Sequence, residues 1–344
     1  MVMKTIYFSL RLLILEALFC TSIITSACSQ GTAGKTSTGQ SNMLREVIVS
    51  YADKASTLQL YRVNEDGSAR RKITNSNNNC VMPAWSPDGK KLVYVQEGMS
   101  GLQLWLSDQY GMNPRLIMNS DIGLNRMPSW MPDSKHIVWM VSTPNSKTPE
   151  EKSTLMIMNT ETLQFRQLFS DSVQTRFSNS MPVVSPDGTM VAFVSDRSGK
   201  YRIWVSNIDG TAARLISPMS AEVSTALQLP IEQKVPTWSP DGRWIAHWEG
   251  VEMVYLSNFT GKNDPQRDKD IARTWNAWVV GNDGNNKRIA GHGDDPTWSP
   301  DGFVTRTFSD QGGVYIMIES NNGWKELPII PAQTLRFGRF TWKP

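Results

Sequence analysis

The residues of this chain that could carry acid–base or metal chemistry are three histidines and a few clustered aspartates. His136 and His247 stand near predicted strands, and His292 lies in a glycine-rich segment beside Asp294 and Asp295. A symmetric metal centre in a repeated structure would use equivalent positions, and no two of these histidines share one. We therefore interpret His136 and His247 as structural. A ligand role for His292 with its two aspartates stays open, but we predict no metal site and no cofactor.

A further acidic group lies in residues 256–275, the most charged insertion in the chain. Its aspartates at positions 264, 268 and 270 could offer oxygen ligands to Ca²⁺, but their spacing lacks the glycine and the terminal glutamate of an EF-hand loop. We interpret this segment as a solvated loop on a rigid scaffold, together with two other irregular segments, residues 143–152 and 218–234.

A short phrase of the form Pro-x-Trp-Ser-Pro-Asp-Gly recurs with small changes at residues 83–89, 128–134, 182–188, 236–242 and 296–302. Its serine and aspartate recur in nearly every copy, whereas a catalytic group would be expected once. They are better explained as formers of a type I turn, in which Pro presets φ and Asp accepts hydrogen bonds from nearby amides. The Trp is expected to pack as a wedge between adjacent repeats. No Gly-x-Ser-x-Gly nucleophile motif occurs.

A second phrase alternates with the first and consists of an apolar strand, a polar turn that usually ends in Gly, and another strand. Its six copies occupy residues 60–73, 104–117, 155–168, 203–216, 277–289 and 315–327. Residues 340–344 look like a sixth, truncated copy of the first phrase. Repeats of this length with several short strands predict a propeller. We expect an all-β, six-bladed β-propeller over residues 44–344, closed by pairing of N-terminal strands with the C-terminal strand.

The N-terminus has the features of an export signal. Residues 1–27 contain a positive charge, an apolar run and small residues ahead of Cys28, which predicts a lipoprotein signal peptide and acylation of Cys28. Residues 28–43 are expected to be a flexible tether, because residues 29–42 contain no large apolar side chain. Cleavage would leave Cys80 without a disulfide partner. An ordinary signal, an uncleaved anchor or a misplaced start remain alternatives.

The composition excludes some classes of function. The net charge is only +3, and the one dense basic run is Arg70-Arg71-Lys72, so nothing indicates nucleic-acid binding. No segment after the signal has 18 consecutive apolar residues, so no further membrane span is expected.

The repeated phrase, with Ser-Asp-Arg-Ser-Gly at residues 195–199, resembles the TolB-like, WD-repeat-like β-propeller family over essentially all of residues 44–344. No counterpart of the N-terminal α/β domain of TolB stands ahead of the repeats. The resemblance implies a non-enzymatic bacterial envelope lipoprotein that binds a protein or peptide. Its location would be the cell membrane or outer membrane, facing the periplasm or the exterior. Related propeller lyases imply an alternative, a polysaccharide lyase or hydrolase with a site in the central channel.

The candidate binding surface is the channel mouth, formed by residues just before each Pro-x-Trp. These residues are polar and differ between repeats: Asn79, Arg126, Asn179, Lys234, Asp294 with Asp295, and Arg339. A packing role would favour similar residues in every copy, so this variation suits an asymmetric ligand. Three basic groups facing an acidic pair would suit a peptide with acidic residues or a C-terminal carboxylate. Simple hydration of a polar mouth is the alternative.

Overall fold

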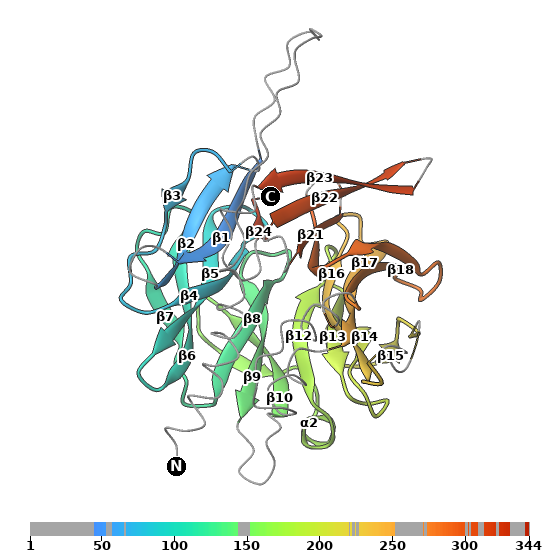
Figure 1. Ribbon diagram of the computed structural model, residues 1–344. Helices are drawn as coiled ribbons and strands as arrows, with labels where there is room; N and C mark the ends of the chain where they lie inside the picture. The colour runs from blue at the N-terminus through green and yellow to red at the C-terminus, as the bar shows by residue number, and fades with distance from the viewer. Residues whose placement is uncertain are drawn as a thin grey trace, which may run out of the picture.

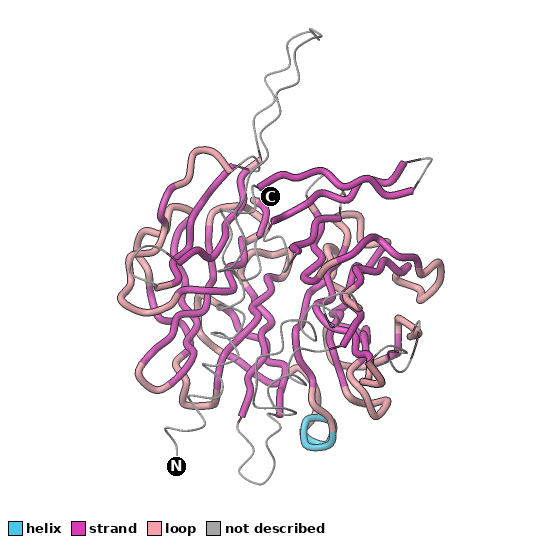
Figure 2. The backbone as a smooth tube through the Cα atoms, viewed as in Figure 1, coloured by secondary structure: helices cyan, strands magenta, loops and turns pink. Residues whose placement is uncertain are grey.

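A computed structural model describes residues 45–52, 57–64, 67–143, 152–219, 221, 224, 227–251, 271, 274–299, 302, 304–308, 313–320, 323–330 and 341–343. Strands dominate this part of the chain, which contains one short helix, α2 (Asp171–Arg176) (Figure 2). Cys28, the predicted signal and tether, Arg339 and most of residues 143–152 and 256–275 lie outside the described residues.

Five sheets each consist of four consecutive antiparallel strands (Figure 1). We name each blade after its innermost strand. The β4 blade contains β4 (Cys80–Trp85), β5 (Lys91–Gly98), β6 (Gly101–Asp108) and β7 (Arg115–Met118). The β8 blade contains β8 (Leu124–Trp130), β9 (His136–Thr143), β10 (Lys152–Asn159) and β11 (Phe165–Gln167).

The other three blades follow the same order. The β12 blade contains β12 (Asn179–Val184), β13 (Met190–Ser195), β14 (Arg202–Asn207) and β15 (Arg214–Leu215). The β16 blade contains β16 (Ile231–Trp238), β17 (Trp244–Val251), β18 (Asn276–Gly281) and β19 (Arg288–His292). The β20 blade contains β20 (Asp294–Trp298), β21 (Val304–Phe308), β22 (Gly313–Ser320) and β23 (Gly323–Ile330).

The remaining sheet is a composite that we call the seam sheet. It contains β24 (Thr341–Trp342), β1 (Glu46–Ala52), β2 (Leu58–Asn64) and β3 (Arg71–Lys72), in that order. The expected pairing of β1 with β24 is present, but it joins only Val47 to Trp342 and Ile48 to Thr341. The all-β propeller is confirmed, whereas the predicted ring of six blades needs correction. Five blades consist of consecutive strands, and the ring is completed by this composite sheet with a two-residue inner strand.

The Ser-Pro-Asp-Gly turns form as predicted. In the first copy Gly89 adopts φ +68° and donates its N–H to the carbonyl of Ser86 at 2.8 Å. The Asp88 carboxylate accepts the Ser86 hydroxyl at 2.6 Å and the Lys90 N–H at 3.1 Å. The Ser86 hydrogen bond, aided by the Lys90 amide, lowers the pKa of Asp88. The repeated serine and aspartate are therefore engaged in the turn itself.

Indole hydrogen bonds join neighbouring blades. The Nε1 atoms of three tryptophans donate to a backbone carbonyl of the preceding blade: Trp130 to Ala84 at 3.0 Å, Trp238 to Val183 at 3.0 Å, and Trp298 to Thr237 at 3.1 Å. The inner strand of the β12 blade has Val184 at the equivalent position, and its backbone N–H instead donates to the Ser129 hydroxyl at 3.2 Å. These bonds confirm the predicted wedge role of the phrase's tryptophan.

The hydrophobic core also lies between blades. One buried cluster joins Val95 and Leu104 of the β4 blade to Ile137 and Trp139 of the β8 blade. Because a blade exposes both of its faces to its neighbours, its strands read as nearly continuous apolar runs. Closing the ring is therefore what buries the core.

The alternating strand directions define two ends of the propeller. At the mouth end the inner strands β4, β8, β12, β16 and β20 begin. At the turn end lie the Ser-Pro-Asp-Gly turns and the turns between the third and fourth strands. Backbone hydrogen bonds of 2.9 Å join the two kinds of turn, from Gln109 to Lys90 and from Asn282 to Arg243.

A buried polar cluster interrupts the core between the β12 and β16 blades. His247 is fully buried, and its Nε2 lies 2.8 Å from the hydroxyl of Ser217. Gln233 donates to Ser217 at 3.2 Å and to the Glu249 carboxylate at 3.0 Å. Lys287 Nζ lies 2.6 Å from the same carboxylate and completes the cluster. His247 thus has the structural environment that its sequence position suggested.

The seam sheet generates a stability prediction. Deleting residues 340–344 removes the buried Trp342 and its pairing with β1. Loss of a buried Trp side chain typically costs about 3–5 kcal/mol. We expect urea unfolding to show a loss of at least this size. Lys343→Met is the control, since it removes only the half-exposed 2.9 Å ion pair with Glu46 and should cost about 1 kcal/mol or less. Equal midpoints for the truncated and native proteins would contradict this account of the seam.

His247 generates a pH prediction. Burial, together with the positive charge of Lys287, lowers its pKa to about 4, and Glu249 opposes this shift only in part. An unfolded histidine has a pKa of about 6.5, so the unfolded state binds more protons between these two values. The contribution of neutral His247 to the free energy of unfolding should therefore be fully present above pH 6.5. It should decrease as the pH falls towards 4, by up to about 1.4 kcal/mol per pH unit.

The measurement is urea unfolding between pH 7 and pH 5, a range that lies above the ordinary pKa of carboxylates. His247→Gln keeps a hydrogen-bonding side chain but cannot titrate, so it should flatten the slope. His292→Gln makes the same substitution at an exposed histidine and serves as the matched variant. A His247→Gln protein with the native slope would show that His247 does not set this dependence.

Candidate functional site

A bulge occurs in the inner strand of each of the five blades, directly before the first proline of the phrase. The register between first and second strands shifts there in all five blades. The bulged residues adopt left-handed backbone angles, with φ between 45° and 56°: Met82, Met127, Met181, Val235 and Asp295. Such angles are unfavourable for residues with a Cβ by about 1–2 kcal/mol. The proline that follows has no N–H, so the ladder loses no donor at that position.

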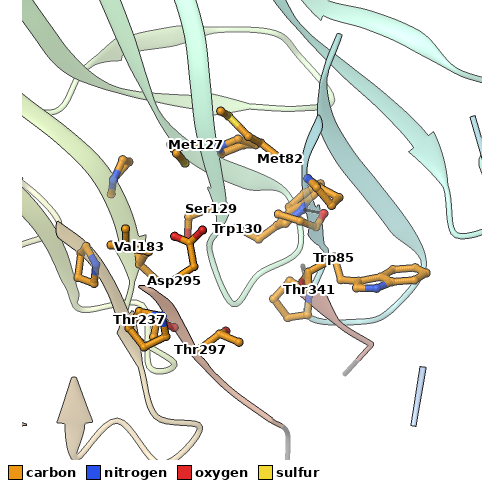
Figure 3. A pocket seen from close by; sticks show the side chains of 18 residues that line it. Met82, Trp85, Met127, Ser129, Trp130, Val183, Thr237, Asp295, Thr297 and Thr341 are labelled. Atoms are coloured by element: carbon orange, nitrogen blue, oxygen red, sulfur yellow. Dashed lines mark hydrogen bonds between the residues drawn. The ribbon is translucent and has the colours of Figure 1, made fainter. Parts of the chain in front are cut away.

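These bulges surround a cavity of about 240 Å³ in the central channel (Figure 3). Its wall contains residues of β4, β8, β12, β16, β20 and β24, so every inner strand contributes. Bulged residues Met82, Met127 and Val235 and a ring of prolines make the wall mostly apolar. Ser129 and Thr237 add hydroxyl groups.

Among the described residues that line the cavity, Asp295 is the only ionisable one. Figure 3 shows its side chain pointing into the cavity. It stands at the same bulge position as the methionines of the other blades, on a backbone with φ 45°. The cavity therefore combines apolar walls with one carboxylate. Such a space can hold an apolar side chain and can orient a polar group beside it.

Arg126 and Lys234 occupy one equivalent position in two different blades. Each directly precedes a cavity-lining bulge residue, Met127 or Val235, and each pairs with the second strand of its blade, opposite Met140 or Trp248. Both side chains are half-buried. Asp294 occupies the same position on β20, opposite Thr307. The structure thus brings three of the predicted mouth residues to one level of the channel.

The other predicted residues are placed differently. Asn79 is half-buried, accepts the Leu58 N–H at 2.8 Å and donates to Glu97 at 2.9 Å, so it joins the seam sheet to the β4 blade. Asn179 is fully buried and does not face solvent as expected. Its side chain donates to the carbonyl of Phe177 at 3.3 Å. Asn79 and Asn179 lie four and three residues before the phrase, out of register with Arg126.

The cations at the mouth end have partners within the protein. Lys234 lies 3.3 Å from Glu232 and 5.4 Å from the ring centre of Tyr201. Arg197 lies above the ring of Phe169 at 4.6 Å and donates to Asn179 at 3.3 Å. Burial lowers the pKa of Arg197, and the neighbouring Asp196 opposes this effect. A carboxylate that approached Lys234 would therefore have to compete with Glu232.

The remaining histidines are not grouped. His136 Nδ1 lies 2.6 Å from Asp133 in a turn, and His292 Nδ1 lies 2.7 Å from the carbonyl of Trp275. Within the described ranges, no three His, Cys, Asp or Glu side chains come together as a metal site would require. The helical part of those ranges likewise includes no segment long and apolar enough to cross a membrane.

Of the five bulged residues, only Asp295 was predicted from the sequence. A prediction based on polarity does not select Met82, Met127 or Val235, although each stands immediately before the proline of the repeated phrase. Aligning the phrase by its proline would have found them, because it places three methionines, one valine and one aspartate in one column.

Comparisons with known proteins agree with this fold. The TolB β-propeller domain matches residues 38–250. The Tol-Pal system protein TolB of Francisella tularensis subsp. tularensis is 26% identical over 196 residues, which cover 57% of this chain and 41% of that protein. The chain therefore spans less than half the length of this curated relative.

Two solved structures are similar. TolB from Acinetobacter baumannii gives a TM-score of 0.64 at 20% identity, covering 87% of this chain and 67% of that one. An oligogalacturonate lyase in complex with manganese gives a TM-score of 0.54 at 15% identity, covering 81% and 72%. At 20% and 15% sequence identity, structural similarity shows only that the proteins share a fold. The domain match covers more than half of the sequence, and on that basis the chain belongs to the TolB β-propeller family.

Proposed function

We propose that this protein is a non-enzymatic lipoprotein of the bacterial envelope that binds a protein or peptide segment at the mouth end of its propeller. The observation that carries the proposal is that basic side chains lie directly above an apolar cavity in the channel. Arg126 and Lys234 stand at one level, and the residues that follow them, Met127 and Val235, line the cavity directly below. An acidic segment with one apolar side chain would match both levels.

The size and chemistry of the cavity favour a peptide. A volume of about 240 Å³ lies below the range of about 300–1,000 Å³ that holds drug-sized ligands. It suits one or two side chains. The methionines on its wall are flexible and polarizable, which helps a surface adapt to different apolar groups. The name of the Francisella relative refers to the Tol-Pal system, and we extend an envelope partner to this chain by analogy.

A polysaccharide lyase or hydrolase is the second candidate, supported by the likeness in fold to the oligogalacturonate lyase. Asp295 is the channel residue that such chemistry would use first, as a general base or a ligand. Incubation of the protein with oligogalacturonate and Mn²⁺, followed by absorbance of the unsaturated product, tests this candidate. Turnover that disappears in Asp295→Asn would replace the binding function with an enzymatic one.

Charge reversal at the mouth tests the binding function. Arg126→Glu with Lys234→Glu should abolish capture of the partner from detergent-solubilised envelope, because both cations would become repulsive to an acidic segment. Arg126→Glu alone should change the melting temperature little, since that residue is half-buried. Lys234 is 15% exposed and pairs with the buried Glu232, so its reversal should also lower the melting temperature, and capture is compared at a temperature where both variants are folded.

The matched control reverses Lys135 and Arg243, two exposed cations at the turn end of the same two blades. It changes the net charge by the same amount and should leave capture intact. Capture that survives reversal at Arg126 and Lys234 would contradict the mouth as the binding surface. Loss of capture in both double variants would indicate a general charge effect.

We also propose that Cys28 is acylated and anchors the protein to a membrane through the tether. The support is the small residues before Cys28 and the absence of large apolar residues from positions 29–42. Cys28→Ala should remain unprocessed or leave the membrane fraction. Fractionation with globomycin-treated cells as a reference measures both effects. A variant that is processed and membrane-bound like the native protein would contradict the anchor.

A further inference from the structure

The turn between β6 and β7 differs chemically from the corresponding turns of the β12 and β16 blades. Asp209-Gly210-Thr211 and Asp283-Gly284-Asn285 are polar, whereas the β4 blade has Tyr110-Gly111-Met112 at these positions. Asp209 and Asp283 stabilise their own turns by accepting the N–H two residues later, both at 2.9 Å. In the β4 blade a different residue, Asp108, accepts the hydrogen bonds that stabilise the turn.

Asp108 takes over the turn-forming role. Its carboxylate accepts the N–H of Tyr110 at 2.9 Å and that of Met112 at 2.8 Å. The side chains of Tyr110 and Met112 are therefore not needed to form the turn. They are 52% and 61% exposed, and Leu116 on the adjoining strand β7 is 41% exposed. The turn thus presents the side chains of Tyr110 and Met112 to the outside, beside the exposed Leu116 of β7.

Basic residues lie directly beside this turn. A Cβ at Gly111 would come within 2.4 Å of the carbonyl oxygen of Ile73, so the turn packs against the end of strand β3. Arg70, Arg71 and Lys72 precede Ile73, are all exposed, and form the one dense basic run of the sequence. In Figure 1, β3 and β7 are the outer strands of neighbouring sheets.

The same surface adjoins the point at which the tether enters the propeller. Glu46, at the start of β1, accepts Arg62 Nε at 2.6 Å, and the Arg62 guanidinium lies 5.8 Å from the ring centre of Tyr110. Glu46 and Tyr110 both belong to the turn end. If the residues between Cys28 and Arg45 form the flexible tether expected from the sequence, their root-mean-square length is roughly 20–25 Å. The exposed turn is therefore held within reach of the surface to which the anchor attaches.

We propose that Tyr110, Met112 and Leu116, with the basic run 70–72, form a surface that rests on an anionic phospholipid bilayer. This inference relies on the anchor proposed above. Tyrosine is favoured at the membrane interface, where its ring is apolar and its hydroxyl remains hydrated. A basic patch beside a lipid anchor adds electrostatic attraction to an anionic bilayer surface and so orients the anchored domain. The contact directs the turn end towards the membrane and leaves the mouth end accessible.

The test measures whether position 112 touches lipid. Full-length Met112→Cys protein is labelled with an environment-sensitive fluorophore and reconstituted into vesicles of phosphatidylethanolamine and phosphatidylglycerol. Met99→Cys is the matched control, because Met99 is fully exposed in the same blade, between β5 and β6 at the mouth end. Native Cys80 should stay unlabelled, since it is buried and burial raises its pKa to about 11.

We expect a blue shift and quenching by a lipid-borne spin label at position 112, and neither at position 99. Arg71→Glu with Lys72→Glu should weaken the contact about fivefold for each basic group removed. Phosphatidylcholine vesicles should weaken it similarly. A shift at both positions, or at neither, in protein that floats with vesicles would overturn the contact alone. Protein that does not float would contradict the anchor and the contact together. A blue shift that occurs without vesicles and grows with protein concentration would show instead that the patch binds a second copy of this chain.

Discussion

A blade of this propeller can bury its two faces only against the neighbouring blades, so every blade depends on closure of the ring. Hydrogen bonds between blades are one result of this closure, since the indoles of Trp130 and Trp238 each donate to a backbone carbonyl of the preceding blade. At the seam the pattern changes. Trp85 packs in a buried cluster with Ile48 and Leu60 of the seam sheet, and its buried Nε1 has no hydrogen-bond partner among the described residues. There the ion pairs of Glu46 with Arg62 and Lys343 link β1 to β2 and to the end of β24.

Local chemistry explains which parts of this fold could be predicted. A Ser-Pro-Asp-Gly turn depends on the preferences of four adjacent residues, and the Ser86–Asp88–Gly89 geometry follows from them. The tryptophan wedge was predictable because the same residue recurs at the same place. The Ser217–His247 contact was not, since it joins residues 30 positions apart from two different blades. No local pattern encodes such a pair.

The prediction of which residues occupy equivalent positions at the mouth was partly wrong for a related reason. A residue before proline normally prefers an extended backbone, so nothing in the sequence indicates that Met82 or Met127 is left-handed. The bulge changes which side chains line the channel from that point on. Selection by polarity alone therefore grouped Asn179, a buried structural residue, with Arg126 and Lys234. The composite seam was expected as a pairing, but the short length of β24 depends on where the sheet ends, which the sequence does not specify.

The seam also determines how the two ends of the propeller can be used. Each blade has four antiparallel strands, an even number, so the chain leaves a blade at the end where it entered. Every inner strand therefore begins at the mouth end, and Arg126 and Lys234 gather there. The seam sheet is offset by one strand, because its inner strand comes from the C-terminal β24 and its second strand, β1, is the first described in the chain. This offset brings Glu46, at the start of β1, to the turn end. The strand exchange that closes the ring thus places the first described residues of the chain at the end opposite the mouth, which is the arrangement that the proposed anchor at Cys28 requires if the mouth is to stay open to the proposed partner.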